Sequence, residues 1–396
     1  MENVINTLLI QNFKSIRHAV LHPRRVNLII GPPNVGKSTL LEAMSLLGGL
    51  QFEHRRKFMR GFVRYEEPAQ LFYDCVLTNP VRIESDSDVC LLGAHGTKPG
   101  FHYGVFDQAT YHHLRLQLGL PQLDSRLRTR AADDASLLPQ LQANPELLHT
   151  LPTAGGHYLE LDEKGRIQRP VSATDSEAPA PANWFPRPVK AYRFKHNARL
   201  DRCFPDASLW PPFGTNLVQV LEQHPSLRRE FSELFGRQHQ HLRVRHTPSR
   251  LEVGKEVNGH SYAYPYSGAG DTLRRFGFHL AAIESSQQAV VLLEEPESHS
   301  YPGYITQLAE RMVAHENNQF FVTTHSPYFF DSVLENMVPY ESRMPELAVF
   351  VVDYREFQTR IRQLSDEEVR GLQRDSLDAF NNLHLLAHEG GVRKLV

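Results

Sequence analysis

The sequence predicts a doubly wound α/β fold whose sheet is built from both ends of the chain. Short apolar runs, typical of strands buried on both faces, occur at 26–30, 289–293 and 319–323. Segments with apolar residues at helical spacing alternate with these runs. The residues between the two ends have a mixed pattern, so we expect them to be inserted into this fold.

The first 50 residues have a clear pattern of short elements. Residues 5–11 and 16–21 are predicted to be paired strands, and 26–30 is the first buried strand. A Gly/Pro loop follows, and a helix is predicted over 37–47, where a Gly–Gly pair ends it. A strand, a glycine-rich loop and a helix therefore follow one another directly.

The middle of the chain contains short elements of both kinds. Residues 107–150 are predicted to be helical, and 157–168 has the pattern of a hairpin. Residues 172–188 are rich in Pro, Ala and Ser, which predicts a linker. From Tyr266 onward the pattern is regular again, with helices over 272–285 and 301–314, a strand at 347–352 and an amphipathic helical end.

These patterns divide the chain into four predicted parts. They are residues 1–54, with the glycine-rich loop; 55–210, the inserted region; 211–352, the remainder of the α/β head; and 353–396, a tail suited to contact with a partner or another copy.

Composition excludes several classes of protein. The 396 residues include 43 basic and 45 acidic side chains, so no overall positive charge points to nucleic acid. The three cysteines, Cys75, Cys90 and Cys203, are far apart, which excludes a disulfide framework and is typical of a reducing cytosol. No apolar run approaches the roughly 20 residues that span a bilayer, and the first residues lack the pattern of a signal peptide. We expect a cytoplasmic chain with no membrane partner.

The strongest chemical signal is the sequence GPPNVGKS at 31–38, which matches the pattern GxxxxGK[ST] between a buried strand and a helix. Its backbone N–H groups would hold a phosphate chain at the start of the helix. Lys37 would reach the β- and γ-phosphates, and the Ser38 hydroxyl would bind Mg²⁺. The predicted nucleotide-binding residues of this loop are Gly31, Pro32, Pro33, Asn34, Val35, Gly36, Lys37, Ser38 and Thr39.

Two acidic residues follow the buried strand at 289–293. In the sequence VVLLEEPE we predict that Glu294 holds Mg²⁺ and that Glu295 polarises the attacking water. A surface acidic turn is the alternative, and the glycine-rich loop favours the metal site. His325 directly follows the strand at 319–323, at the edge of the sheet where ligands bind, and is predicted to contact the γ-phosphate or the water.

A further turn, SGAGD, opens the helix predicted over 272–285. Ser267, Gly268 and Gly270 could bind an anion at this helix start, for example the γ-phosphate held by another protomer. The alternative is an ordinary helix-capping turn.

Taken in order, NFKS, GPPNVGKST, SGAGD, LLEEPESHSYP and TTHSP resemble the motifs of ABC-type ATPases of the SMC/Rad50/RecF class. More narrowly, they resemble the OLD-like AAA ATPases of bacterial defence systems. The resemblance implies an ABC-type ATPase head with a mixed sheet, split by a middle α/β insertion. It also implies an ATP-sandwich dimer in which Ser267, Gly268 and Gly270 complete the site of the partner protomer.

The resemblance implies two more site residues and shows some departures. Lys14 of the NFKS segment is a candidate phosphate contact, and Gln70 is a candidate glutamine in the metal shell. Pro33 stands where the family often has Asn, and Ser300 and Tyr301 replace its usual Leu-His. The contacts of the loop after Glu297 therefore stay open.

The resemblance implies a regulatory ATPase with slow turnover, similar to the ATPases of the PARIS and Septu or retron-associated antiphage systems. ATP and Mg²⁺ are the expected cofactors. The expected partners are further copies of the chain in a dimer or higher homo-oligomer, a separate TOPRIM or HNH nuclease effector, and a phage trigger protein. A RecF- or Rad50-like ATPase that clamps DNA in its ATP state is the alternative, and clusters such as Arg243 and Arg245 leave DNA binding open.

Overall fold

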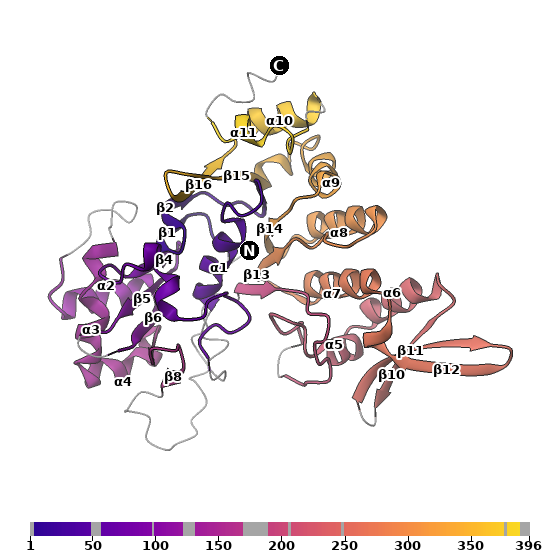
Figure 1. Cartoon of the computed structure of the whole chain (residues 1–396), viewed down its shortest axis with the longest axis horizontal. Coiled ribbons are helices and arrows are strands. Elements are labelled where there is room, and N and C mark those ends of the chain that lie inside the picture. Colours follow the sequence, from indigo (N-terminus) through magenta and orange to yellow (C-terminus); the bar gives the residue numbers. More distant parts are fainter. Residues whose placement is uncertain are drawn as a thin grey trace.

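The structure is a computed structural model (Figure 1), and it describes residues 4–48, 57–96, 99–121, 131–168, 189–204, 207–246, 249–375 and 378–388. The predicted linker at 172–188 lies outside the described residues. Among the residues described, no helix combines the length and the apolar character needed to cross a bilayer.

A six-stranded sheet forms the centre of the fold, in the order β16-β15-β3-β14-β13-β9. All neighbouring strands are parallel except β15 and β16, which form an antiparallel hairpin. The strands are β3 (Val26–Ile30), β9 (Val189–Tyr192), β13 (Val290–Glu294), β14 (Gln319–Thr323), β15 (Leu347–Arg355) and β16 (Gln358–Gln363). The α/β class predicted from the sequence is confirmed, as is a mixed sheet drawn from both ends of the chain.

Alternate residues of the central strands enter two hydrophobic cores. Leu28 and Val322 are side by side in one core, where α7 (Asp271–Ser285), α8 (Pro302–Ala314) and α9 (Pro327–Met337) cover the sheet. Ile29 and Phe321 point into the other core, which contains α1 (Lys37–Ser45). β3 and β14 are buried at every position, which explains their unbroken apolar patterns.

A second, seven-stranded sheet has the order β2-β1-β4-β5-β6-β7-β8, with all neighbours antiparallel. Its strands are β1 (Leu8–Phe13), β2 (Ile16–Leu21), β4 (Val81–Glu84), β5 (Asp88–Ala94), β6 (Phe101–Asp107), β7 (Gly156–Leu161) and β8 (Ile167–Gln168). Because β1 pairs with β4, the expected boundary at residues 54 and 55 divides one continuous sheet. β9 also falls within the predicted insertion, yet it is the edge strand of the central sheet.

Three helices cover the outer part of the second sheet: α2 (Gln108–Gln117), α3 (Leu137–Gln142) and α4 (Pro145–Ala154). A buried polar network lies beneath them, in which Asp134 contacts both Arg82 of β4 and Arg115 of α2. The Tyr111 hydroxyl donates to Asp134 (2.6 Å) and accepts from Arg82 (2.7 Å). Each member of this network therefore has a partner, as burial requires.

The remaining elements flank the central sheet. α5 (Leu217–Gln223), α6 (Pro225–Gly236) and the antiparallel strands β10 (His241–His246), β11 (Ser249–Val257) and β12 (His260–Pro265) precede α7. Figure 1 shows the β11–β12 hairpin projecting away from the rest of the molecule. The helices α10 (Asp366–Arg374) and α11 (Leu383–Leu386) follow β16.

Candidate functional site

The glycine-rich loop joins β3 to α1 at the carboxyl edge of the central sheet. Gly36 caps the helix with φ 106°, a conformation that favours glycine. A Cβ atom on Gly36 would lie only 2.2 Å from the Oγ1 atom of Thr359 on β16. The Thr359 hydroxyl in turn lies 2.8 Å from the carbonyl oxygen of Val35. Close packing against β16 therefore fixes this loop and requires glycine at its end.

Lys37 is the buried cation of the loop. Its Nζ atom donates to the carbonyl oxygens of Gly31 (2.9 Å) and Pro32 (2.7 Å). Burial lowers the pKa of Lys37 to about 8, although the nearby Glu295 and Glu297 act in the opposite direction. An ammonium group held by two carbonyl oxygens at the start of a helix is suited to accept phosphate oxygens in their place, so these residues fit a nucleotide.

Ser38 and Glu294 provide the oxygen atoms expected of a magnesium site. Glu294 is the last residue of β13, and Ser38, the second residue of α1, donates a hydrogen bond to its carboxylate. Burial raises the pKa of Glu294, but Arg193, the Ser38 hydroxyl and Arg64 together bring it below its ordinary value. An ionised carboxylate beside a hydroxyl is a donor set that fits Mg²⁺.

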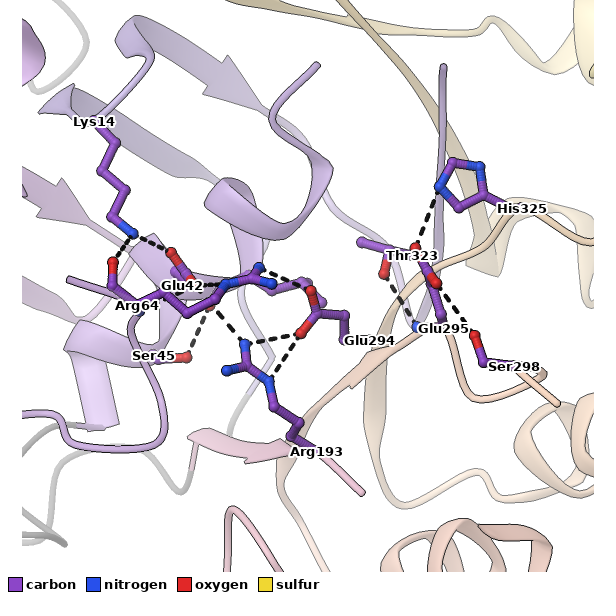
Figure 2. Close-up of polar contacts among 11 residues, drawn as sticks. Lys14, Glu42, Ser45, Arg64, Arg193, Glu294, Glu295, Ser298, Thr323 and His325 are labelled. Carbon is purple, nitrogen blue, oxygen red and sulfur yellow. Dashed lines mark hydrogen bonds and ion pairs between the residues drawn. The ribbon is translucent and has the colours of Figure 1, made fainter. Parts of the chain in front are cut away.

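Two arginines that the sequence analysis did not identify contact Glu294 (Figure 2). Arg64 lies 2.9 Å from its Oε1 atom, and Arg193 lies 2.8 Å from its Oε2 atom. Arg64 also pairs with the buried Glu42 (2.7 Å), as does Lys14 (2.5 Å). The five side chains form one charged cluster beside the glycine-rich loop, and the predicted phosphate contact Lys14 is engaged within it.

Glu295 and His325 lie together on the other side of the site (Figure 2). The His325 Nε2 atom is 3.2 Å from Glu295 Oε1, and Ser298 donates to Glu295 Oε2 (3.2 Å). Burial and the nearby Lys37 lower the pKa of His325 below its ordinary value, so the ring is largely neutral at pH 7. The pair combines a carboxylate, which can accept a proton, with an imidazole that can orient a water molecule.

Glu297, the third acid of the EEPE sequence, also contributes to the site, although the sequence motif assigns it no role. It is 7% exposed, and its Oε1 atom accepts from the Thr324 hydroxyl (2.7 Å) and from the His325 N–H (2.9 Å). Burial raises its pKa. Glu297 therefore positions the backbone of the turn that carries His325, and the third acid of the EEPE sequence was the signal for it.

The structure places most of the predicted residues around one cleft of about 680 Å³. Its volume falls within the range of about 300–1,000 Å³ that is usual for small-molecule sites. The predicted residues that line it are Lys14, Pro33, Asn34, Gly36, Lys37, Ser38, Thr39, Glu294, Glu295 and His325. They come from the turn after β1, the glycine-rich loop, α1 and the carboxyl ends of β13 and β14, so side chains that are far apart in the sequence lie around one cleft.

Seven predicted residues do not line this cleft: Gly31, Pro32 and Val35 of the glycine-rich loop, Gln70, and Ser267, Gly268 and Gly270. The Gln70 side chain accepts a hydrogen bond from the N–H of Glu66 (2.8 Å), and the end of β9, next to β13, brings Arg193 to Glu294 instead. Ser267, Gly268 and Gly270 form the turn before α7, where the Ser267 carbonyl accepts from Arg274 (3.0 Å). No group of three or more His, Cys, Asp or Glu side chains suited to a metal occurs within the described part of the chain.

Comparisons with known proteins give one family match over part of the chain and several similar solved structures. Residues 139–331 match the family described as "AAA domain, putative AbiEii toxin, Type IV TA system". A search of curated proteins finds no match.

Three solved structures of SMC head domains are similar to this chain. An SMC head bound to the C-winged helix domain of ScpA is 13% identical, covers 92% of this chain and 99% of its own, and has a TM-score of 0.45. The SMC head domain from Thermotoga maritima is 11% identical, covers 91% of this chain and 99% of its own, and has a TM-score of 0.37. An SMC head with an extended coiled coil, bound to the C-terminal domain of ScpA from Pyrococcus furiosus, is 12% identical. It covers 94% of this chain and 99% of its own, and its TM-score is 0.44.

The family match covers only part of the candidate site. It includes the turn at Ser267, both acids after Leu293, and His325, and it excludes the glycine-rich loop at 31–36. Over just under half of its length, the chain is thus similar to an AAA domain.

Proposed function

We propose that this chain binds ATP with Mg²⁺ in the cleft beside the glycine-rich loop and hydrolyses it slowly. The observation that carries the proposal is the arrangement of charges across this cleft. Lys37 and Ser38 lie on the side of the loop, and Glu294, Glu295 and His325 approach from β13 and β14. A cationic cradle for the phosphates that faces a carboxylate able to accept a proton from water supports phosphoryl transfer to water.

The roles of the residues follow from their contacts. Lys37 exchanges the carbonyl oxygens of Gly31 and Pro32 for phosphate oxygens. Ser38 and Glu294 would hold Mg²⁺, which when bound neutralises charge on the phosphates. The Glu295 carboxylate accepts a proton from the attacking water, and the neutral His325 ring orients that water. Glu297 keeps His325 in place through the backbone N–H.

The turn at Ser267, Gly268 and Gly270 is assigned to a second protomer's nucleotide. It lies outside the cleft of its own chain, and no atom lies within 4 Å of the position that a Cβ on Gly270 would occupy. This open backbone precedes a 15-residue helix whose positive end favours anions. The proposal is an ATP-bound dimer with two shared sites, which can assemble into a higher homo-oligomer.

At the cellular level we propose a regulatory subunit of an antiphage system. The matched family is described with a putative toxin of a type IV toxin–antitoxin system, which supports a defence role. The chain would hold a separate effector, a TOPRIM or HNH nuclease, and release or activate it when a phage trigger protein acts. A bacterial host that carries this chain and the protein encoded beside it should resist phage infection, and Lys37→Ala should remove that resistance.

The biochemical proposal is tested with Glu295→Gln. This variant should bind ATP but turn it over very slowly, and it should accumulate as an ATP-dependent dimer in size-exclusion chromatography. The matched control is Glu341→Gln, an exposed glutamate that precedes β15 at the opposite edge of the sheet. Native turnover in Glu295→Gln would overturn the role of Glu295, and absence of ATP binding by the native chain would overturn the whole proposal.

The second candidate function is an ATPase that clamps DNA. Arg243 and Arg245 alternate along β10, so they share one face of its sheet, and each is about half exposed. Glu252 pairs with Arg245 on the same face (3.5 Å), which reduces the positive potential there. Tight binding of duplex DNA at physiological salt, lost in the Arg243→Ala/Arg245→Ala variant, would favour this candidate over the first.

A further inference from the structure

The turn between β15 and β16 contains an unusual residue. Arg355 pairs with Gln358, so Glu356 and Phe357 form a two-residue hairpin turn, and both have positive φ angles (51° and 61°). Turns of this kind favour Asn-Gly, and a bulky residue with positive φ is uncommon. The Phe357 side chain is 82% exposed, so packing does not explain its presence. A strained and exposed aromatic residue points to a ligand that covers it.

This turn lies beside the candidate nucleotide site. Thr359 follows Phe357 by two residues, about 6.6 Å along a strand. The Thr359 N–H donates to the carbonyl oxygen of Ser15 (2.8 Å), which lines the cleft, and its side chain contacts Val35 and Gly36 of the glycine-rich loop. Through Thr359, the hairpin turn that carries Phe357 is therefore anchored to the side of the cleft on which Ser15 lies.

A second aromatic side chain reaches the same turn. The Tyr73 hydroxyl donates to the carbonyl oxygen of Phe357 (3.3 Å). The short 3-10 helix Tyr73–Cys75 is fixed beside Lys14, because the Lys14 N–H donates to the carbonyl oxygen of Leu71 (3.0 Å). Phe357 and Tyr73 thus both flank the turn at Lys14 and Ser15, which leads into the cleft.

The polarity of the cleft determines which part of a nucleotide meets these rings. Glu294 ends β13 and Glu295 follows it, so the metal and the terminal phosphate belong on that side of the glycine-rich loop. β15 and β16 lie on the opposite side of β3. A phosphate chain that runs across the loop from Glu294 therefore directs its nucleoside toward Ser15, Thr359 and Phe357.

We propose that Phe357 is the stacking surface for the nucleobase, that Tyr73 borders the same subsite, and that the ligand is a purine nucleoside triphosphate. The inference rests on the proposed function and adds to it the residue that holds the base. Because 82% of the Phe357 side chain is exposed, its ring gains from a large planar base, which covers more of the ring than a pyrimidine. The hairpin thereby connects base binding to the glycine-rich loop through Thr359.

Two ligands that differ only in the nucleoside separate this subsite from the phosphate cradle. The affinities of ATP and of inorganic tripolyphosphate, each with Mg²⁺, are measured by calorimetry on the full chain. Phe357→Ala should weaken ATP binding roughly tenfold and leave tripolyphosphate binding within about twofold of native. Phe357→Tyr should retain ATP affinity, whereas Phe357→Leu, which keeps bulk without an aromatic face, should behave like Phe357→Ala.

The control is Tyr340→Ala, another exposed aromatic residue, which precedes β15 at the opposite edge of the sheet and should leave both affinities unchanged. Native ATP affinity in Phe357→Ala would overturn the subsite while leaving the proposed function intact. Equal loss of ATP and tripolyphosphate binding would also overturn it, because the variant would then have disturbed the glycine-rich loop. Lys37→Ala should lose both ligands, which tests the proposed function separately.

Discussion

The Arg193 guanidinium contacts a single oxygen atom of Glu294, with its Nε at 3.0 Å and its Nη2 at 2.8 Å. The other carboxylate oxygen is 2.9 Å from Arg64. Two cations from distant parts of the chain therefore neutralise the residue proposed to hold Mg²⁺. A divalent cation that binds Glu294 competes with both guanidinium groups for the same oxygen atoms.

This competition predicts that Arg193→Ala strengthens metal binding by the nucleotide-free chain. Removal of one guanidinium leaves Glu294 with less neutralising charge, so the half-saturating concentration of Mn²⁺ should fall several-fold, as measured by electron paramagnetic resonance. Arg193→Lys should give an intermediate value, because its ammonium group can replace only part of the contact. Glu294→Ala should abolish the binding, and unchanged affinity in Arg193→Ala would contradict the competition.

The lowered pKa of Lys37, about 8, predicts a pH dependence of ATP binding. Phosphate oxygens bind the protonated amine, and the free protein loses that proton as pH rises through 8. ATP affinity should then fall by up to about tenfold per pH unit above this value. Lys37→Arg, which stays protonated, should show no such decline. A native profile that stays flat up to the ordinary pKa of lysine would show that the ammonium is not the group that titrates.

The two hydrogen bonds that Glu297 accepts predict that its loss lowers both stability and ATP turnover. Glu297→Ala leaves the Thr324 hydroxyl and the His325 N–H without their acceptor, which should lower the free energy of unfolding by about 1–3 kcal/mol. It should also slow ATP turnover, since His325 loses its positioning contact. Glu297→Gln keeps a carbonyl oxygen in place and should retain most of both properties in chemical denaturation and turnover assays. If the two variants behave alike, the hydrogen bonds to Oε1 are not what holds His325.

Asp134 predicts a stability effect that is separate from the site. It is buried between Arg82 and Arg115, so Asp134→Ala leaves the buried Arg115 guanidinium without its carboxylate and leaves Arg82 with Glu84 alone. The free energy of unfolding should fall by about 3–5 kcal/mol. ATP affinity of the folded chain should not change, because none of the three residues lines the cleft. A loss of affinity in the folded variant would show that the second sheet is coupled to the nucleotide site.

The part of the site that could be predicted from the sequence is the part encoded locally. The glycine-rich loop, the acids after β13 and His325 each follow a buried strand, and parallel strands bring their carboxyl ends to one edge. Arg64 and Arg193 reach Glu294 from outside any such motif. Arg193 directly follows β9, which neighbours β13. Because this neighbour relation appears only in the folded sheet, the sequence does not reveal that Arg193 reaches Glu294.

The fold shows the same division between local and long-range information. The strand at 26–30 and the helix before Ser285 were predicted within a residue or two, because apolar spacing is a local property. The pairing of β1 with β4 was not predicted, since it joins residues that lie about 70 positions apart in the sequence. Antiparallel pairing depends on which edges meet, and short strands give little indication of their partners.

The position of β3 between β14 and β15 has a consequence for biosynthesis. β3 is made early, yet both of its neighbours in the sheet belong to residues 319–355. During translation the glycine-rich loop has no Thr359 behind it, and the apolar strand before it has no sheet to enter. The glycine-rich loop therefore gains its support from β16, and with it the proposed nucleotide affinity, only after residues 319–363 have been translated.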